Sequence, residues 1–168
     1  MPQAQLKSQD AKRIAHDLAI DLATAAWLHP LVHALARKKD PQAVHLTLTV
    51  DCLFVSSIVV TLSKFCEFHD RFASILPEGL RRESGKLKAD LVSRGLLEFR
   101  SKYLAHVWDD EASQPLATSQ VDDYVGRITG VAPGAEWVSF LRWLANIDAP
   151  EDPTTVAGLL ARIENAAL

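Results

Sequence analysis

Residues 45–65 read HLTLTVDCLFVSSIVVTLSKF, and this stretch decides the fold class. Its β-branched residues would suit a strand, but a run of this length without a turn signal favours a helix. A membrane span would place Asp51 close to the bilayer centre, at a cost of about 2.5 kcal/mol or more. We therefore expect a core helix from about Ala43 to Ser74 at the centre of a bundle. Its seam residues, spaced alternately by four and three, are Leu48, Cys52, Val55, Val59, Leu62 and Cys66.

The sequence on either side of this helix predicts two more long helices. The first begins after Ser8 as its N-cap and runs to about Arg37, with Pro30 kinking or breaking it. Its inner residues are Ile14, Leu18, Leu22 and Ala25. The other runs from about Arg82 to His106. Its inner residues are Val92, Leu96, Phe99 and Tyr103.

The last third of the chain predicts three shorter helices. Ser119 and Asp122 form a capping-box-like start to one of them, which Gly130 stops. Another covers residues 135–147, with its inward side chains at Trp137, Phe140, Leu141 and Leu144, and the last begins at Thr155. No stretch shows sustained alternation with hairpin turns, so the expected fold class is all-α, a helical bundle with two long central helices.

Length and composition favour one domain. A chain of 168 residues, 48% hydrophobic and 23% charged, can bury its own core. We expect a single helical domain over residues 1–168, with a motif-bearing core at about 43–110 and a helical C-terminal extension at about 118–168. Cys52 and Cys66 lie about 21 Å apart along one helix, too far for a disulfide, so both are expected as small core residues. Because the N-terminus is polar where a signal peptide would be apolar, we expect a cytoplasmic protein with no membrane contact.

Basic residues gather in one helix of an otherwise acidic protein, whose formal net charge is −3. Residues 77–106 carry seven basic and four acidic side chains, whereas residues 107–168 carry three and ten. Such a run is either a solvated helix face or a contact for an anion or nucleic acid, and composition leaves both open.

The stretch FRSKYLAHVWDD, residues 99–110, places an arginine and a histidine near the end of this basic helix. An ideal helix leaves Arg100 and His106 about 120° apart around its axis and about 9 Å apart along it. The two side chains can then contact the same ligand only through the long reach of arginine, an unwound last turn, or a second copy of the helix across a two-fold axis. The pair could cleave phosphodiesters without a metal, since imidazole moves protons and guanidinium stabilises phosphate charge. The alternative is a surface arginine and a histidine that stabilises a helix C-terminus.

The segment LLEFRSKYLAHVWDD resembles the signature of the HEPN family, an arginine separated by four to six residues from a histidine. It looks most like the AbiU-type branch, whose helix reads as arginine, a polar pair, an aromatic or aliphatic pair, and then Ala-His. The matching positions are Arg100, Ser101, Lys102, Tyr103, Leu104, Ala105 and His106. The likeness covers the general layout of residues 43–110.

This resemblance implies an all-helical homodimer in which two Arg-x5-His motifs face one another across a cleft. It also implies a metal-independent endoribonuclease of toxin or phage-defence type, without a cofactor, that leaves a 2′,3′-cyclic phosphate. A toxin-like member held silent by a cognate antitoxin is a third possibility. His106 would be the acid/base and Arg100 the phosphate ligand. Active members place Asn, Asp or His after the arginine, and Ser101 departs from that pattern. The alternative function is a non-catalytic helical module that binds RNA, a nucleotide or a protein partner.

Asp51 lies among apolar residues and needs a partner, because burial without one would force its protonation. We expect a contact with an arginine or histidine of a neighbouring helix. Arg100 is one option, in which Asp51 would orient the guanidinium; a structural pair elsewhere and a place at the wet helix rim are the others. His29 and His33 share a helix face as metal ligands do, but Pro30 disturbs that geometry and no acidic partner with ligand-like spacing is evident. We therefore expect no metal site.

Two aromatic residues flank the motif and could stack on RNA bases. Tyr103 lies on the core stripe, which favours packing, whereas Trp108 follows the expected helix end. The sequence lacks the glycine motifs of nucleotide-binding loops and the Gly-x-Ser-x-Gly of serine hydrolases, so these common chemistries lose support.

Overall fold

The computed structural model describes residues 3–36, 41–105, 118–131, 137–146, 148–149 and 152–168. Its helices are α1 (Gln3–Ala36), α2 (Pro41–Phe72), α3 (Glu78–Ser93), α4 (Leu96–Phe99), α5 (Thr118–Thr129), α6 (Val138–Leu144) and α7 (Val156–Glu164). A 3-10 turn, Ala73–Ile75, follows α2, and a π-helical segment, Arg100–Ala105, follows α4. Over these residues the chain contains no β-strand. The prediction of an all-α fold is confirmed.

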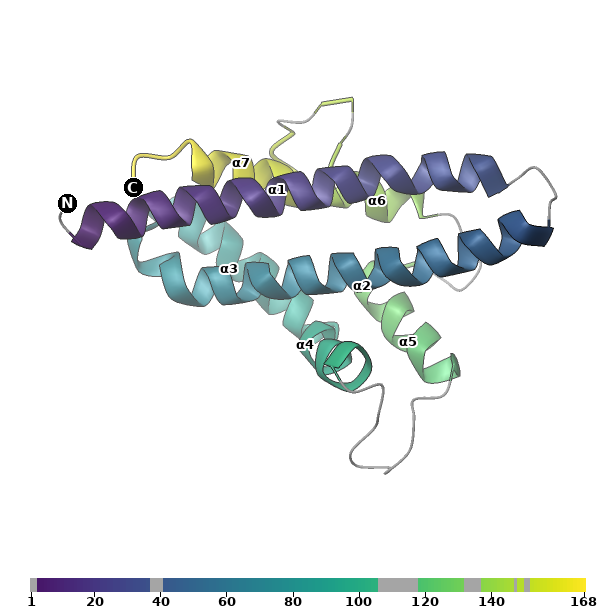
Figure 1. The fold of residues 1–168 in the computed structure, drawn as a ribbon. Helices are drawn as coiled ribbons and strands as arrows, with labels where there is room; N and C mark the ends of the chain where they lie inside the picture. Colours follow the sequence, from purple (N-terminus) through teal and green to yellow (C-terminus); the bar gives the residue numbers. More distant parts are fainter. Residues whose placement is uncertain (1–2, 37–40, 106–117, 132–136, 147, 150–151) are drawn as a thin grey trace.

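The long helices α1 and α2 lie side by side and antiparallel along the length of the molecule (Figure 1). The predicted inner stripe of α1 is largely correct: Leu18, Leu22 and Ala25 are buried and Ile14 is half-buried. Alanines on the same stripe, Ala11, Ala15 and Ala26, are also buried. The short alanine side chains bring neighbouring backbones close to α1.

Both predicted features of the α1 backbone need correction. The helix runs unbroken through Pro30 to Ala36, so the proline does not break it. It also begins at Gln3 rather than after Ser8, since residues 3–7 are good helix formers. The Ser8 hydroxyl is no cap; it donates to the carbonyl oxygen of Leu168 at 3.2 Å. Both termini therefore lie at the same end of the bundle (Figure 1).

Helix α2 contributes the largest buried side chains. Of the predicted seam, Leu62 is fully buried, Val59 and Cys66 are nearly so, and Val55 is half-buried. Phe65, which the seam did not include, is also fully buried. The expectation for Cys52 was wrong, because Cys52 is exposed. Around Cys52, apolar residues lie on every face of α2, so their periodicity alone did not identify the face that packs against the core.

Helices α6 and α7 pack along α1, and α3 packs against α2 and also contacts α7 (Figure 1). Buried residues from all seven helices belong to one hydrophobic cluster. In the α6 region Phe140, Leu141 and Leu144 are buried as predicted, and Trp137 is half-buried. The Thr155 side chain accepts a hydrogen bond from the Gly158 amide and caps α7. Gly130, with φ of 69°, ends α5 as expected.

The predicted helix from Arg82 to His106 is interrupted, which is the main correction to the fold. Its described part consists of α3, a turn at Arg94 and Gly95, α4 and the π-helical segment. Gly95 has φ of 83°, a left-handed conformation that glycine adopts without strain. The turn changes the helix direction, so Leu96 and Phe99 are buried whereas Val92 is exposed.

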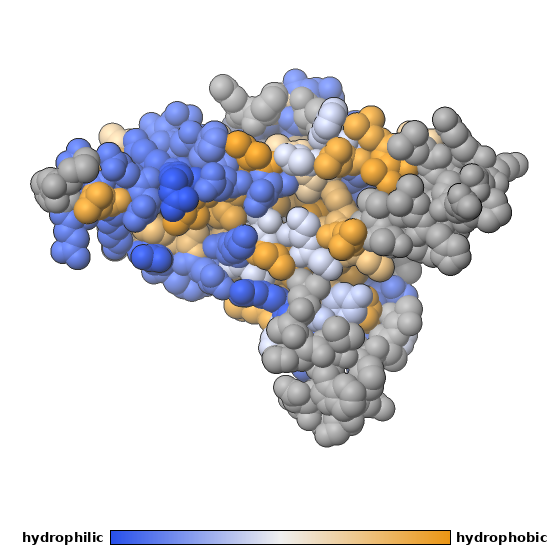
Figure 2. Space-filling model, in the orientation of Figure 1, coloured by the Kyte–Doolittle hydropathy of each residue, from blue (hydrophilic) through white to orange (hydrophobic). Residues whose placement is uncertain are grey.

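One described helical stretch, Asp51–Ile75, is long and apolar enough to cross a membrane by length and composition. Half of its most apolar window is buried inside the molecule, and the core helix of a globular protein passes the same test. Figure 2 shows mostly hydrophilic side chains at the end that carries the termini and hydrophobic ones along the other half of α1.

Candidate functional site

Arg100 is the first residue of the π-helical segment, where α4 ends. Its side chain is 40% exposed, and Nη1 donates to Oε1 of Glu67 on α2 at 2.6 Å. A π-helical turn is wider than an α-helical one and occurs frequently at functional sites. The described part of the motif is therefore π-helical rather than α-helical. An unwound last turn stays a prediction, because His106 lies outside the described residues.

A surface hollow of about 400 Å³ lies beside Arg100; we call it the Arg100 hollow. It is lined by Cys66, Glu67, Asp70, Leu97, Arg100 and Ser101. Helix α2 supplies its acidic side, and α4 with the π-helical segment supplies the guanidinium, a hydroxyl and an apolar rim. The hollow can accept a small polar group against Arg100.

The neighbours of Arg100 in the motif have different environments. Ser101 is exposed at the hollow. The ammonium of Lys102 pairs with Glu98 at 3.2 Å. Tyr103 is half-buried, with its ring stacked on Phe99 at a centroid distance of 5.0 Å. Tyr103 therefore packs against the core, as its place on the stripe predicted.

Cys66 contributes a thiol to the lining of the hollow, and its environment disfavours the thiolate. Burial, with smaller contributions from Asp70 and Glu67 and against the effect of Lys88, raises the pKa of Cys66 to about 11. At neutral pH the thiol stays protonated, so Cys66 is a small core residue, as predicted.

The basic helix is largely neutralised by its own neighbours. Lys88 pairs with Asp70, and Arg94 pairs with Asp90 while donating to the Ile128 carbonyl at 3.1 Å. Together with the pairs of Arg100 and Lys102, these contacts favour a solvated helix face over a continuous basic patch.

Part of the predicted site lies outside the described residues. His106 and Trp108 belong to the range 106–117, and the side chains of Leu104 and Ala105 likewise lie outside the described part of the chain. The distance between Arg100 and His106, and a cleft between two motifs, stay predictions.

Asp51 pairs with two histidines of the neighbouring helix α1. Its Oδ1 lies 2.8 Å from His33 Nε2 and 3.5 Å from His29 Nε2. The expected contact with a histidine is present, but the option of Arg100 is not: the partner of Arg100 is Glu67, about 24 Å farther along α2. Asp51 therefore does not orient the Arg100 guanidinium.

The His29 ring is enclosed by other rings. Its centroid lies 4.3 Å from that of His33, 4.7 Å from Phe54 and 5.3 Å from Trp137. Burial lowers the pKa of His29, and His33 lowers it further, against the opposite effect of Asp51. His29 is therefore a neutral imidazole near pH 7.

Sequence reasoning missed this cluster, although a signal was present. His29 and Asp51 are equally far from residue 40, in the turn expected between the first two helices. Antiparallel helices joined there bring such positions side by side, and the i, i+4 spacing then adds His33.

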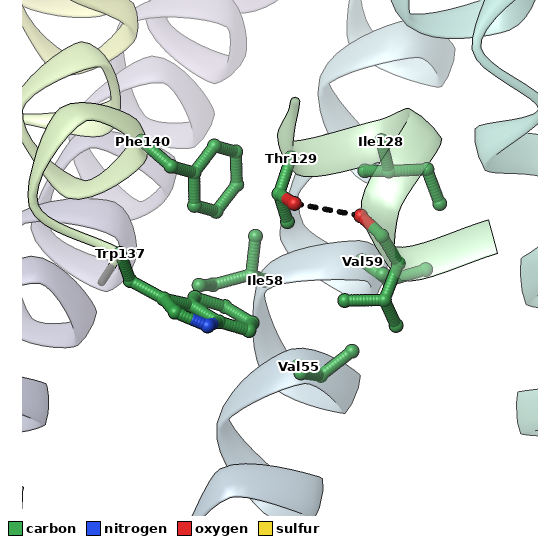
Figure 3. Close-up of a pocket in the computed structure, with 8 residues that line it drawn as sticks. Val55, Ile58, Val59, Ile128, Thr129, Trp137 and Phe140 are labelled. Atoms are coloured by element: carbon green, nitrogen blue, oxygen red, sulfur yellow. Dashed lines mark hydrogen bonds between the residues drawn. The ribbon is translucent and has the colours of Figure 1, made fainter. Parts of the chain in front are cut away.

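A second, much smaller pocket lies between α2, α5 and α6 (Figure 3). Its lining is almost wholly apolar: Val55, Ile58, Val59, Val125, Ile128, Thr129, Trp137 and Phe140. The Thr129 hydroxyl is already satisfied by the Val125 carbonyl at 2.7 Å. With a volume of about 10 Å³, the pocket is a packing gap rather than a ligand site.

Comparisons of the sequence with protein-family models, with curated proteins and with solved structures found no match. The candidate site is therefore argued from the residues and their geometry, and membership of the HEPN family stays a prediction.

Proposed function

We propose that this chain is a metal-independent endoribonuclease of the HEPN type, a cytoplasmic homodimer acting as a toxin or in phage defence. One observation supports this best: the motif arginine begins a π-helical segment and presents its guanidinium at an open hollow beside Ser101.

The proposed reaction is attack of a ribose 2′-hydroxyl on the adjacent phosphorus. His106 accepts the 2′-hydroxyl proton as the O2′–P bond forms, and the P–O5′ bond breaks as the 5′-oxygen takes up a proton from water. The products are a 2′,3′-cyclic phosphate and a 5′-hydroxyl. Arg100 stabilises the negative charge that develops on the non-bridging phosphate oxygens.

The ion pair with Glu67 leaves Arg100 available to a phosphate. The Glu67 side chain is 61% exposed, and exposed ion pairs contribute about 0–1 kcal/mol. A bidentate guanidinium–phosphate contact is at least as strong, so RNA can displace the carboxylate. Until it does, Glu67 holds the arginine at the hollow.

Apolar residues near the motif support a second copy of the chain as a partner. Leu97 lines the Arg100 hollow and is exposed, and Val92 on α3 is exposed as well. Dimerisation over this rim would bring two motifs together. Sedimentation velocity of the purified protein checks the prediction, since a monomer at all concentrations would contradict it.

A second candidate function is a non-catalytic helical module that binds a protein partner. It is favoured by large exposed apolar side chains on α1, namely Ile20, Trp27, Leu28 and Leu31, with Leu53 on α2. In this alternative, substitutions in the motif change no enzymatic activity.

Cleavage of labelled transfer RNA and of an unstructured RNA, in excess EDTA, tests the proposal. We expect Arg100→Ala and His106→Ala to lose about 10²–10⁴-fold in rate. Binding of RNA, followed by fluorescence anisotropy, should persist in His106→Ala. Arg81→Ala is the matched control, because it removes an exposed cation of α3 outside the motif. Equal cleavage by all variants, or none by the wild type, would contradict the proposal.

A further inference from the structure

We propose that His29, His33 and Asp51 bind a divalent first-row transition-metal ion, best matched by Zn²⁺, which joins α1 to α2 near the turn between them. The site is separate from the Arg100 hollow, since Asp51 and Glu67 are about 24 Å apart along α2. It therefore does not depend on the proposed ribonuclease activity.

The three side chains already converge on one point. Their ligand atoms all lie within 4.8 Å of one another. Zinc binds histidine nitrogen and carboxylate oxygen at about 2.0–2.2 Å, so tetrahedral ligands are about 3.3 Å apart. The distance from His29 Nε2 to Asp51 Oδ1 is 3.5 Å, and that from His33 Nε2 to the same oxygen is 2.8 Å. For an ion to bind, the 2.8 Å distance would lengthen by about half an ångström. The two histidine nitrogens, which lie within 4.8 Å of one another, would also settle at the tetrahedral spacing.

Both imidazoles are held in place before a metal arrives. Helix α1 continues through Pro30, so the i, i+4 spacing keeps His29 and His33 on one face, contrary to the expectation that proline would disturb it. Phe54 and Trp137 pack on the His29 ring and fix its orientation.

The donor set identifies the class of ion. Two imidazole nitrogens and one carboxylate oxygen suit zinc and its first-row neighbours, whereas Mg²⁺ and Ca²⁺ prefer oxygen ligands throughout. The side chains of His33 and Asp51 are 39% and 32% exposed, so water reaches the fourth coordination position. Three protein ligands with one open position is the arrangement of many reactive zinc sites.

A hydrogen-bonded His33–Asp51 pair without an ion accounts for only part of this geometry. In that pair His33 Nε2 carries the proton and donates it to the carboxylate. This pair does not explain why the buried His29 also directs its Nε2 at Asp51 Oδ1, 3.5 Å away. When a metal binds, it takes the position of that proton, which is released or moves to Nδ1.

Zinc titration of untagged, chelator-treated full-length protein, in competition with a chromophoric chelator, tests the site. We expect one high-affinity Zn²⁺ per wild-type chain. His33→Ala and Asp51→Asn should each weaken binding at least tenfold, because even outer-shell changes cost about 10–100-fold. His16→Ala is the matched control: it removes another histidine of α1, which pairs with Glu164, and should retain wild-type affinity. Wild-type affinity in both His33→Ala and Asp51→Asn would overturn the proposal.

A measurement on the wild type alone tests the site even if the variants fail to fold. Bound Co²⁺ in a site with two nitrogens and one oxygen gives visible d–d absorption, and one equivalent should saturate it. Absence of this absorption together with no Zn²⁺ uptake by the wild type would overturn the site. Because the protein needs no metal for RNA cleavage in the proposed function, failure here leaves that proposal intact.

Discussion

Arg100 of the π-helical segment and Glu67 of α2 form an ion pair, with Arg100 Nη1 2.6 Å from Glu67 Oε1. The contact joins the motif to the central hairpin and places a carboxylate where a phosphate would bind. Glu67 therefore both positions the arginine and competes with the proposed substrate.

Removing the charge of Glu67 should strengthen RNA binding. Glu67→Gln keeps the size of the side chain but gives up the ion pair, which contributes about 0–1 kcal/mol, so RNA affinity should rise by up to about fivefold. Fluorescence anisotropy with a labelled RNA at low salt measures this. The control is Glu83→Gln, whose carboxylate pairs with Arg162 instead. Weaker RNA binding by Glu67→Gln, with Glu83→Gln unchanged, would contradict a contact between Arg100 and the phosphate.

Gly95 should tolerate no side chain without a loss of stability. Its φ is 83°, and an L-residue in the left-handed region costs about 1–2 kcal/mol. The nearest atom to a Cβ added at Gly95 would be Tyr124 Cε1 at 3.5 Å, an ordinary contact, so the cost is in the backbone. Urea unfolding of Gly95→Ala should show this loss. Gly79→Ala in α3, where nothing lies within 4 Å of a Cβ, should be neutral or stabilising by up to about 1 kcal/mol. Equal stability of the two variants would be inconsistent with the turn.

Mild acid should destabilise the fold through His69. Burial lowers the pKa of His69, as does Lys88, against the effect of Asp70, and its Nδ1 lies 2.9 Å from Ser84 Oγ. The unfolded state, with a histidine pKa near 6.5, binds more protons, so the free energy of unfolding falls as pH drops from 7.5 toward 5.5. His29, lowered in the same direction beside His33 and Asp51, adds to this loss.

The variant His69→Gln separates the His69 contribution from the rest. Urea unfolding at pH 7.5 and pH 5.5 should give a smaller difference for His69→Gln than for the wild type. Carboxylates with a lowered pKa, such as Glu83 and Glu98, lose their stabilising effect only below their ordinary pKa of about 4.3. An identical pH dependence in the two proteins would exclude a role for His69.

Two substitutions in α2 distinguish its buried and exposed faces. Phe65 is fully buried, so Phe65→Ala should cost about 3–5 kcal/mol of the free energy of unfolding. Leu53 on the same helix is 66% exposed, so Leu53→Ala should change stability by less than about 0.5 kcal/mol. Thermal unfolding of both variants checks this, and a similar loss in each would mean that Leu53 also packs against another surface.

The helices could be predicted from the sequence wherever apolar periodicity was regular. Leu18 and Leu22 on α1, and Phe140 and Leu144 on α6, are buried as their spacing required. The prediction failed at Cys52, because apolar residues surround that part of α2. It also failed at Val92, because the turn at Gly95 depends on a left-handed conformation. A single glycine allows this conformation, but its presence in the sequence does not by itself predict it.

The candidate sites were less predictable because they depend on contacts between helices. Nothing local pairs Arg100 with Glu67, which lies 33 positions away in sequence. The need of Asp51 for a partner was clear from its apolar surroundings, but the choice of His33 over Arg100 depends on how α1 and α2 align. Pro30 was misleading, because a packed helix can pass through a proline that would interrupt an isolated one.

The most direct test of the central claim is the chemistry of the cut RNA ends. Wild-type protein and His106→Ala, purified identically, are incubated with labelled RNA in excess EDTA. An oligonucleotide of the same sequence that lacks the 2′-hydroxyls serves as the substrate control. We expect that only the wild type cleaves, that only the RNA with 2′-hydroxyls is cut, and that the new ends carry a 2′,3′-cyclic phosphate. Equal cleavage by His106→Ala, or cleavage of the oligonucleotide without 2′-hydroxyls, would contradict the proposed mechanism.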